Sequence, residues 1–211
     1  MTPNNLIELS RRFRLILASG SPRRVQILTE AGVNFTQQIP HIEEILRKNE
    51  LPEAYARRLA QEKALAVAVN MSESKAISLG CDTIVVLGDD VLEKPTSKEH
   101  AFAMLSHLSG KTHRVISAVA FASGKTVLAQ DCDITEVTFN PLKAEDIHTY
   151  IASGEPMDKA GAYGIQGMGA FLVDSVQGDI DTVVGLPVRC LDRLAGQILQ
   201  QRTEVPDTTD E

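Results

Sequence analysis

Residues 76–87 form a nearly continuous apolar run that is rich in β-branched side chains. A run of this kind is typical of a strand that is buried on both faces, in the middle of a sheet. The sequence Gly88-Asp89-Asp90 then predicts a turn back into a short strand at 91–93. The chain must therefore fold around a sheet whose central strand is covered on each side.

Strands and helices alternate irregularly along the rest of the chain. Periodicity and capping signals predict helices at 23–31, 52–70, 96–110 with Thr96 as the capping residue, 143–152 and from Pro187 onward. They predict strands at 14–18, 35–39, 76–87, 91–93, 113–121, 126–139 and 182–184. This order, with a hairpin across 123–125, favours an α/β fold with a mixed sheet.

Length and charge narrow the class of protein. The chain has 211 residues and a formal net charge of −7, which fits one domain or two small lobes and disfavours a nucleic-acid partner. It contains neither the long apolar run of a membrane helix nor a secretory signal, so we expect a cytoplasmic protein. The three widely spaced cysteines predict reduced, structural thiols. Residues 1–10 and 201–211 are expected to be flexible tails.

The loop at 19–24 places two arginines at the start of a predicted helix. A helix N-terminus carries a partial positive charge, so Arg23 and Arg24 there need a counter-charge. An anion would supply it, because backbone N–H groups, the Ser19 and Ser21 hydroxyls and two guanidinium groups together form a phosphate cradle. The alternative is that both arginines are exposed on a solvated helical turn.

Two charged residues interrupt apolar patterns. Lys63 shares a helical stripe with Tyr55, Leu59 and Val67, so it either extends outward to solvent or projects into a cleft. Asp82 lies within the central strand, where an unpaired carboxylate costs several kcal/mol. It should therefore meet a cation or a metal, or face a cleft. Lys94, held extended by Pro95, could end near Asp82, and a purely structural ion pair between the two is the alternative.

Other candidate features are weaker. The pair Glu43-Glu44 gains meaning only if a divalent metal neutralises phosphates there. The glycine-rich passage at 161–169 matches neither a dinucleotide-binding nor a Walker A pattern, although the Gln166 amide could contact the edge of a base. The five histidines lack metal-ligand spacing, and the absence of GxSxG disfavours a serine hydrolase.

Taken together, these segments resemble the Maf family of nucleoside triphosphate pyrophosphatases from about residue 14 to residue 199. The resemblance is carried by LASGSPRR (17–24), Glu43-Glu44, LAQEKA (59–64), GCDTIVV (80–86), LEKP (92–95), LSGKTHRV (108–115), DKAGAYGIQGMGAF (158–171) and VVGLP (183–187). It implies a fold like that of inosine triphosphatase: a long curved mixed sheet with helices on both sides, and two lobes around a nucleotide cleft. It also implies hydrolysis of a nucleoside triphosphate to the monophosphate and pyrophosphate.

The resemblance also implies roles for individual residues. Asp82 would be the catalytic carboxylate that activates water. Glu44 and Asp82 would hold a divalent metal, Mg²⁺ or Mn²⁺. The triphosphate would be bound by Ser21, Arg24, Lys63 and Lys94. A homodimer is expected at the level of the family.

Within the family, this chain resembles the branch that acts on dTTP and UTP. In that branch the counterparts of Arg23, Thr83 and Gln166 set the choice of base. The resemblance suggests house-cleaning of nucleotide pools and a role in cell division arrest. Two alternatives stay open: the sister branch that acts on 7-methyl-GTP, and a slow nucleotide-binding regulator of septum formation. The segment 178–182 departs from the family's usual Gly-Ser-Tyr run, which leaves the breadth of substrates open.

Overall fold

The computed structural model describes residues 2–71 and 75–203. Its α-helices are α1 (Asn4–Arg12), α2 (Pro22–Glu30), α3 (Pro52–Ala68), α4 (Lys98–Leu108), α5 (Ala144–Ala152), α6 (Ile180–Val184) and α7 (Val188–Thr203). Its strands are β1 (Arg14–Ala18), β2 (Thr36–Gln37), β3 (Ala76–Leu87), β4 (Asp90–Leu92), β5 (Thr112–Ser123), β6 (Thr126–Phe139) and β7 (Val173–Gln177). Short 3₁₀ turns lie at Glu155–Asp158, Ala160–Ala162 and Gly167–Leu172. No helix in these ranges is long and apolar enough to cross a bilayer.

The strands form one mixed sheet in the order β2-β1-β3-β5-β6-β7, with β4 added beside β3. Strand β1 is parallel to both β2 and β3, whereas every other pair in the described sheet is antiparallel. The mixed sheet predicted from the sequence is thus confirmed, and β3 is its central long strand.

One edge of β3 is interrupted at its middle. Strand β5 pairs with β3 without a break from Ser78 to Val86. On the other edge, β1 pairs with β3 only as far as Gly80, and the pairing of β3 with β4 starts only at Val85. Residues 81–84 of β3 therefore have no neighbouring strand on this edge of the described sheet, and the break opens toward the loops that follow β1.

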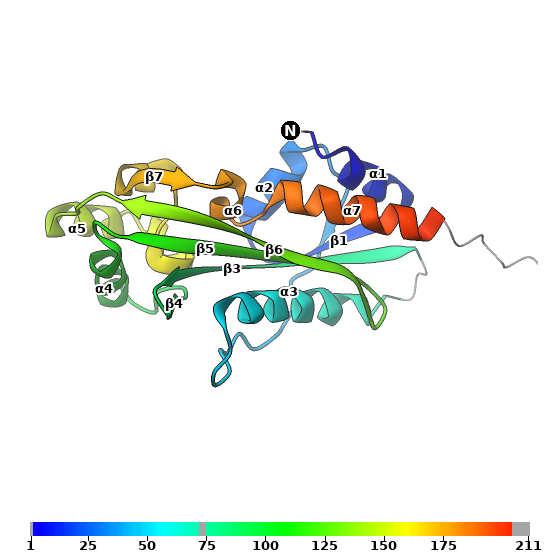
Figure 1. The fold of residues 1–211 in the computed structure, drawn as a ribbon, viewed down its shortest axis with the longest axis horizontal. Helices are drawn as coiled ribbons and strands as arrows, with labels where there is room; N and C mark the ends of the chain where they lie inside the picture. Colours follow the sequence, from blue (N-terminus) through cyan, green and yellow to red (C-terminus); the bar gives the residue numbers. More distant parts are fainter. Residues whose placement is uncertain (1, 72–74, 204–211) are drawn as a thin grey trace, which may run out of the picture.

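Helices cover both faces of the sheet (Figure 1). Helix α3 lies along one face, where Tyr55, Leu59 and Val67 are each 1% exposed, as the predicted stripe requires. Helices α1, α2 and α7 lie on the other face. Burial of the apolar side chains between these layers supplies the main favourable term for folding.

The apolar core is divided between the two ends of the long strands. At one end, which we call the first lobe, helices α1, α2 and α7 pack on β1, β3 and β5 around Leu17, Leu79 and Leu191. At the other end, the second lobe, helices α4 and α5 pack on β5 and β6 around Leu105 and Val137. The expected α/β fold, with a mixed sheet flanked by helices, is confirmed.

The expectation of a flexible tail over residues 1–10 is wrong for most of that segment. Residues 4–12 form α1, where Leu6 and Leu9 are fully buried and the Leu6 backbone N–H donates to Asp192 Oδ1 over 3.0 Å. The apolar residues of α1 form a stripe that packs on α7 and so offsets the entropy of ordering the segment. At the other end α7 continues to Thr203, and the remainder of the expected tail, 204–211, lies outside the described residues.

Three local expectations also differ from the structure. Residues 182–184, predicted as a strand from their β-branched side chains, belong to helix α6, which begins after Asp179; the Asp179 side chain accepts a hydrogen bond from the Asp181 backbone. Strand β7 was not predicted. Helix α4 is capped by Ser97 rather than Thr96, because Ser97 Oγ accepts from the His100 N–H over 3.1 Å.

Candidate active site

A cleft of about 490 Å³ lies where the edge of β3 is interrupted. Its walls come from both lobes: the loop after β1 and the start of α2 on one side, and the segment 158–166 on the other. All the site residues predicted from the sequence line this cleft, namely Ser21, Arg23, Arg24, Glu44, Lys63, Asp82, Thr83, Lys94 and Gln166. Residues between 21 and 166 therefore converge on one place.

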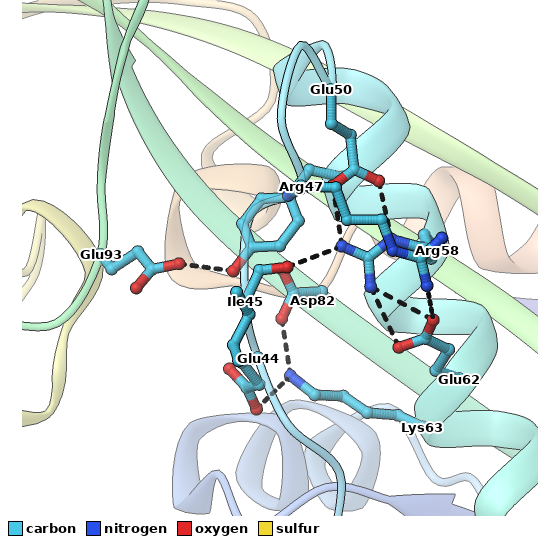
Figure 2. Close-up of polar contacts among 10 residues, drawn as sticks. Glu44, Ile45, Arg47, Glu50, Arg58, Glu62, Lys63, Asp82 and Glu93 are labelled. Atoms are coloured by element: carbon cyan, nitrogen blue, oxygen red, sulfur yellow. Dashed lines mark hydrogen bonds and ion pairs between the residues drawn. The ribbon is translucent and has the colours of Figure 1, made fainter.

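Asp82, Lys63 and Glu44 form a connected group in the cleft (Figure 2). Lys63 Nζ lies 2.6 Å from Asp82 Oδ1 and 2.8 Å from Glu44 Oε1. Lys63 is 8% exposed and Asp82 is 5% exposed, so Lys63 projects into the cleft rather than outward to solvent. The second carboxylate oxygen of Asp82 is buried and has no hydrogen-bond partner among the described residues.

The two carboxylates of this group have different acidities. Burial raises the pKa of Asp82 above its ordinary value, and the charge of Lys63 only partly opposes this effect. Burial also raises the pKa of Glu44, but there the attraction of Lys63, Lys94 and Arg24 outweighs it, and the net pKa is lowered. The two neighbouring carboxylates thus have pKa values shifted in opposite directions, upward for Asp82 and downward for Glu44, a pattern typical of acid–base sites.

Arg24 is a buried cation whose hydrogen-bond acceptors are all neutral. Its guanidinium donates to the carbonyls of Gly185 and Cys81, each over 2.9 Å, to Ser19 Oγ over 3.0 Å and to Thr83 Oγ1 over 3.1 Å. The Cys81 carbonyl lies on the open edge of β3, so Arg24 supplies the hydrogen bond that a neighbouring strand would otherwise donate there. The side chain is only 9% exposed, and its charge is available to an anion in the cleft.

A chain of hydrogen-bonded hydroxyl groups, from Thr83 to Ser117, holds Arg24 in place. Ser117 Oγ donates its proton to the Thr182 carbonyl over 2.7 Å, so it must accept from Thr83, whose Oγ1 lies 2.9 Å away. Thr83 in turn accepts from Arg24. Neither Ser117 nor Thr182 is predicted from the sequence to support the site. The only available signal was the cross-strand pairing of Thr83 with Ser117, which requires the sheet register.

Arg23 connects the two lobes at the mouth of the cleft. Its guanidinium lies 2.9 Å from Asp158 Oδ2, and Lys159 Nζ lies 2.7 Å from the other oxygen of Asp158. Asp158 and Lys159 both line the cleft, although neither is predicted from the sequence as a site residue. Ser21 precedes α2 as its capping residue, and its backbone N–H donates to Ser19 Oγ over 3.2 Å.

Lys94 and Gln166 are exposed residues of the cleft lining. Lys94 is not the ion-pair partner of Asp82, since that position belongs to Lys63. It follows Glu93, which accepts a hydrogen bond from the Tyr55 hydroxyl of α3 and so fixes the segment after β4. The structural ion pair considered for Lys94 and Asp82 is therefore not formed. Lys94 is instead an exposed cation in the lining of the cleft.

The oxygen donors in the cleft suit a hard divalent cation whose remaining coordination positions are filled by water and by a bound ligand. No cluster of three or more His, Cys, Asp or Glu side chains able to hold a metal by themselves occurs in the described ranges. Mg²⁺, however, typically takes one or two carboxylates together with water and phosphate oxygens. Glu44 and Asp82 supply two carboxylates, and the unpartnered Asp82 oxygen is a free donor. The residues present thus fit such a cation.

The cleft thus brings together two buried cations, Arg24 and Lys63, and one buried carboxylate, Asp82, in an α/β fold with a mixed sheet. The family model described as Maf-like protein matches residues 14–198, and the chain belongs to this family. The resemblance inferred from the sequence motifs is thereby confirmed.

Curated relatives match most of the chain. The dTTP/UTP pyrophosphatase of Salmonella typhimurium is 52% identical over 175 residues, which cover 82% of this chain and 87% of the relative. The dTTP/UTP pyrophosphatase of Escherichia coli O157:H7 is 50% identical with the same coverage. Among solved structures, a HAM1 protein from Coxiella burnetii aligns with a TM-score of 0.47 at 15% identity, covering 91% of this chain and 97% of that one. At these values the structural similarity carries no conclusion about substrate.

Proposed function

We propose that the protein hydrolyses dTTP and UTP to the nucleoside monophosphate and pyrophosphate. Two relatives that are 50% and 52% identical over 82% of the chain carry the name dTTP/UTP pyrophosphatase, which supports the substrate. The observation that carries the chemistry is the convergence of buried Arg24, whose acceptors are neutral, with Lys63 and Asp82 in one cleft.

The cations of the cleft hold the triphosphate in this proposal. Arg24, Lys63 and Lys94 line one cavity in a chain whose net charge is −7. A local group of cations with low-dielectric walls attracts a polyanion even when the whole protein is acidic. Ser21 and the backbone N–H groups at the start of α2 add donors for phosphate oxygens, because a helix N-terminus favours negative charge.

Asp82 accepts the proton of the attacking water. The water oxygen forms a bond to the α-phosphorus, the bond from that phosphorus to the bridging oxygen of the β-phosphate breaks, and pyrophosphate leaves. The second carboxylate oxygen of Asp82 is buried at the cleft and has no hydrogen-bond partner in the described structure, which suits it to accept this proton. Glu44 and Asp82 would hold a divalent cation, Mg²⁺ or Mn²⁺, which when bound neutralises phosphate charge. Arg24 and Lys63 stabilise the negative charge that moves to the leaving group.

Base choice is proposed to depend on Arg23, Thr83 and Gln166. The exposed Gln166 amide at the cleft offers both a donor and an acceptor, which is what the O4/N3 edge of a pyrimidine requires. Thr83 is bonded to Arg24 and Ser117, so it would influence the substrate through the position of Arg24. Arg23 would act where it joins Asp158 across the cleft mouth.

The proposed physiological role is house-cleaning of nucleotide pools in the cytoplasm. It requires only a small-molecule substrate. A homodimer belongs to the proposal as a family-level expectation, and sedimentation of the purified chain tests it.

A panel of triphosphates with Mg²⁺ tests the proposal. We expect turnover to be fastest with dTTP and UTP, with monophosphate and pyrophosphate as products. In ¹⁸O-water the label should appear in the monophosphate, because attack is at the α-phosphorus. Release of a nucleoside diphosphate and inorganic phosphate, or a preference for 7-methyl-GTP, would contradict the proposal. Tight binding of the nucleotide without turnover would indicate a regulator. Replacing Gln166 with Ala should change the ranking of nucleotides more than the rate with the best one.

A further inference from the structure

Glu44 is carried by a segment that has little apolar anchorage. Residues 38–51, which we call the Glu44 loop, join β2 to α3 without helix or strand. Ile45, Leu46 and Leu51 are 62%, 42% and 73% exposed, while Ile42 packs only in part against the core beneath α3. Hydrophobic burial alone therefore fixes this loop weakly, and its position depends on polar contacts with the body of the protein.

Arg58 of α3 supplies three of those contacts, more than any other residue in the described structure (Figure 2). Its Nε and one terminal nitrogen each lie 2.7 Å from a carboxylate oxygen of Glu50, and the same terminal nitrogen donates to the Ile45 carbonyl over 2.9 Å. The other terminal nitrogen donates to both oxygens of Glu62 over 3.1 and 3.2 Å. These five hydrogen bonds match the five N–H groups of a guanidinium, so the whole group is used in one fixed orientation.

Two features make this arrangement firm. Hydrogen bonds from Arg58 lower the pKa of Glu50 to about 2, so the pair stays ionised at neutral pH. The loop is also closed on itself, because the Arg47 backbone N–H donates to Glu50 over 3.0 Å. The Arg47 side chain adds a second link to α3, since it lies 3.2 Å from Glu62. Bidentate, partly buried pairs within a network contribute more than isolated surface pairs.

The geometry relates Arg58 directly to Glu44. The Ile45 carbonyl that Arg58 holds belongs to the residue immediately after Glu44, so Arg58 fixes the backbone from which the Glu44 side chain projects. Five residues further along the same helix, Lys63 meets the Glu44 carboxylate at 2.8 Å. Helix α3 thus fixes the backbone at one point and the side chain at another.

We propose that Arg58 is a positioning residue that holds the Glu44 loop, and with it the Glu44 carboxylate, at the cleft. The proposal rests on the proposed function in one respect, namely that Glu44 takes part in hydrolysis. Arg58 does not line the cleft, so it acts through Glu44 and not by touching the nucleotide.

Arg57 provides a matched control on the same helix. It pairs with Asp131 of β6 at 2.7 Å, and its side chain is 34% exposed. Arg57→Gln therefore removes the same charge from the neighbouring position without releasing the Glu44 loop.

Limited trypsin digestion measures the restraint of the loop without reference to activity. Arg47 and Lys48 lie in the loop and are exposed, so cleavage after them reports its opening. We expect Arg58→Gln to be cleaved there at least about tenfold faster than the parent, and Arg57→Gln to be cleaved at the parent rate. Glu50→Gln weakens the same contact from the loop side and should also accelerate cleavage, which keeps the test decisive if Arg58→Gln folds poorly.

A double-mutant cycle measures the connection to Glu44. Arg58→Gln and Glu44→Gln should each lower kcat/KM on dTTP by about 10- to 100-fold, and the double variant should be no more than about twofold worse than the poorer single variant. If Arg58→Gln acted only by lowering the general stability of the protein, its fold-loss in kcat/KM would instead multiply with the fold-loss caused by Glu44→Gln. Unchanged cleavage or multiplying losses would overturn the inference. If the parent hydrolyses no triphosphate, the proposed function fails, and the digestion experiment then decides the inference by itself.

Discussion

Gly80 lies so close to helix α3 that a Cβ at this position would stand 2.1 Å from the Ala60 carbonyl oxygen and 2.5 Å from the Ala64 nitrogen. Both contacts are with helix backbone, which cannot turn aside as a flexible side chain can. The absence of a side chain at Gly80 thus lets α3 approach β3 closely. Asp82 follows two residues later on the same face of β3, where Lys63 of α3 meets it at 2.6 Å.

Replacing Gly80 with Ala should therefore damage both stability and catalysis. The helix must move away from the strand, and such overpacking typically costs about 1–3 kcal/mol. The same movement separates Lys63 from Asp82, so kcat should also fall. Urea denaturation and steady-state kinetics measure the two effects.

Ser78→Ala is the control for this change, because Ser78 is buried on the same strand and its hydroxyl has no partner among the described residues. That variant should be as stable as the parent or more so. Equal stability of Gly80→Ala and the parent would show that the close approach does not constrain the fold.

The neighbours Arg23 and Arg24 should differ sharply in their tolerance of lysine. Arg24→Lys keeps the charge but cannot reproduce four hydrogen bonds to groups in the turn between α6 and α7, in β3 and in the loop after β1. We expect a loss of about 2 kcal/mol or more in the free energy of unfolding. Arg23→Lys changes one partly exposed ion pair with Asp158 and should cost under about 1 kcal/mol. Chemical denaturation of both variants tests this, and similar losses would contradict the assignment.

His113 predicts a pH dependence of stability. Burial lowers its pKa from 6.5 to about 4, and the only hydrogen bond of its imidazole ring in the described structure joins Nε2 to the Tyr163 hydroxyl over 2.8 Å. Between these two pH values the unfolded chain binds a proton that the folded chain does not. The free energy of unfolding should therefore fall as the pH decreases from about 6.5 to about 4, by at most about 3 kcal/mol from this residue.

His113→Gln removes the titrating group and keeps a hydrogen-bonding partner for Tyr163. Thermal or urea unfolding at several pH values should give a flatter profile for this variant than for the parent over the same window. Parallel profiles would show that His113 does not contribute to the acid sensitivity.

Much of the fold and of the site could be predicted because their signals are local. The apolar run at 76–87 identifies the central strand, and the four-residue spacing of Tyr55, Leu59 and Lys63 places a lysine on the buried face of a helix. A carboxylate inside the apolar strand requires a nearby cation. The structure supplies Lys63 at that position rather than Lys94, since only the packing of α3 on β3 decides between them.

Other residues could not be predicted because their partners are distant in the sequence. In the sequence, Arg58 belongs to the mixed-charge surface of a helix, and only the folded Glu44 loop gives it Glu50 and Ile45 as partners. Asp158 meets Arg23 across 135 positions. Residues 182–184 have the composition of a strand, yet the cap from Asp179 and the left-handed backbone of Gly185, with φ 110°, bound a short helix there.

The most direct test of the account is the rate of nucleotide hydrolysis by Asp82→Asn. The substitution keeps the shape of the side chain and removes its ability to accept a proton, so kcat on dTTP should fall by about 10²- to 10⁴-fold while circular dichroism is unchanged. Asp89→Asn, in the exposed turn after β3, should retain the parent rate. A rate for Asp82→Asn within a few-fold of the parent would contradict the role given to this carboxylate.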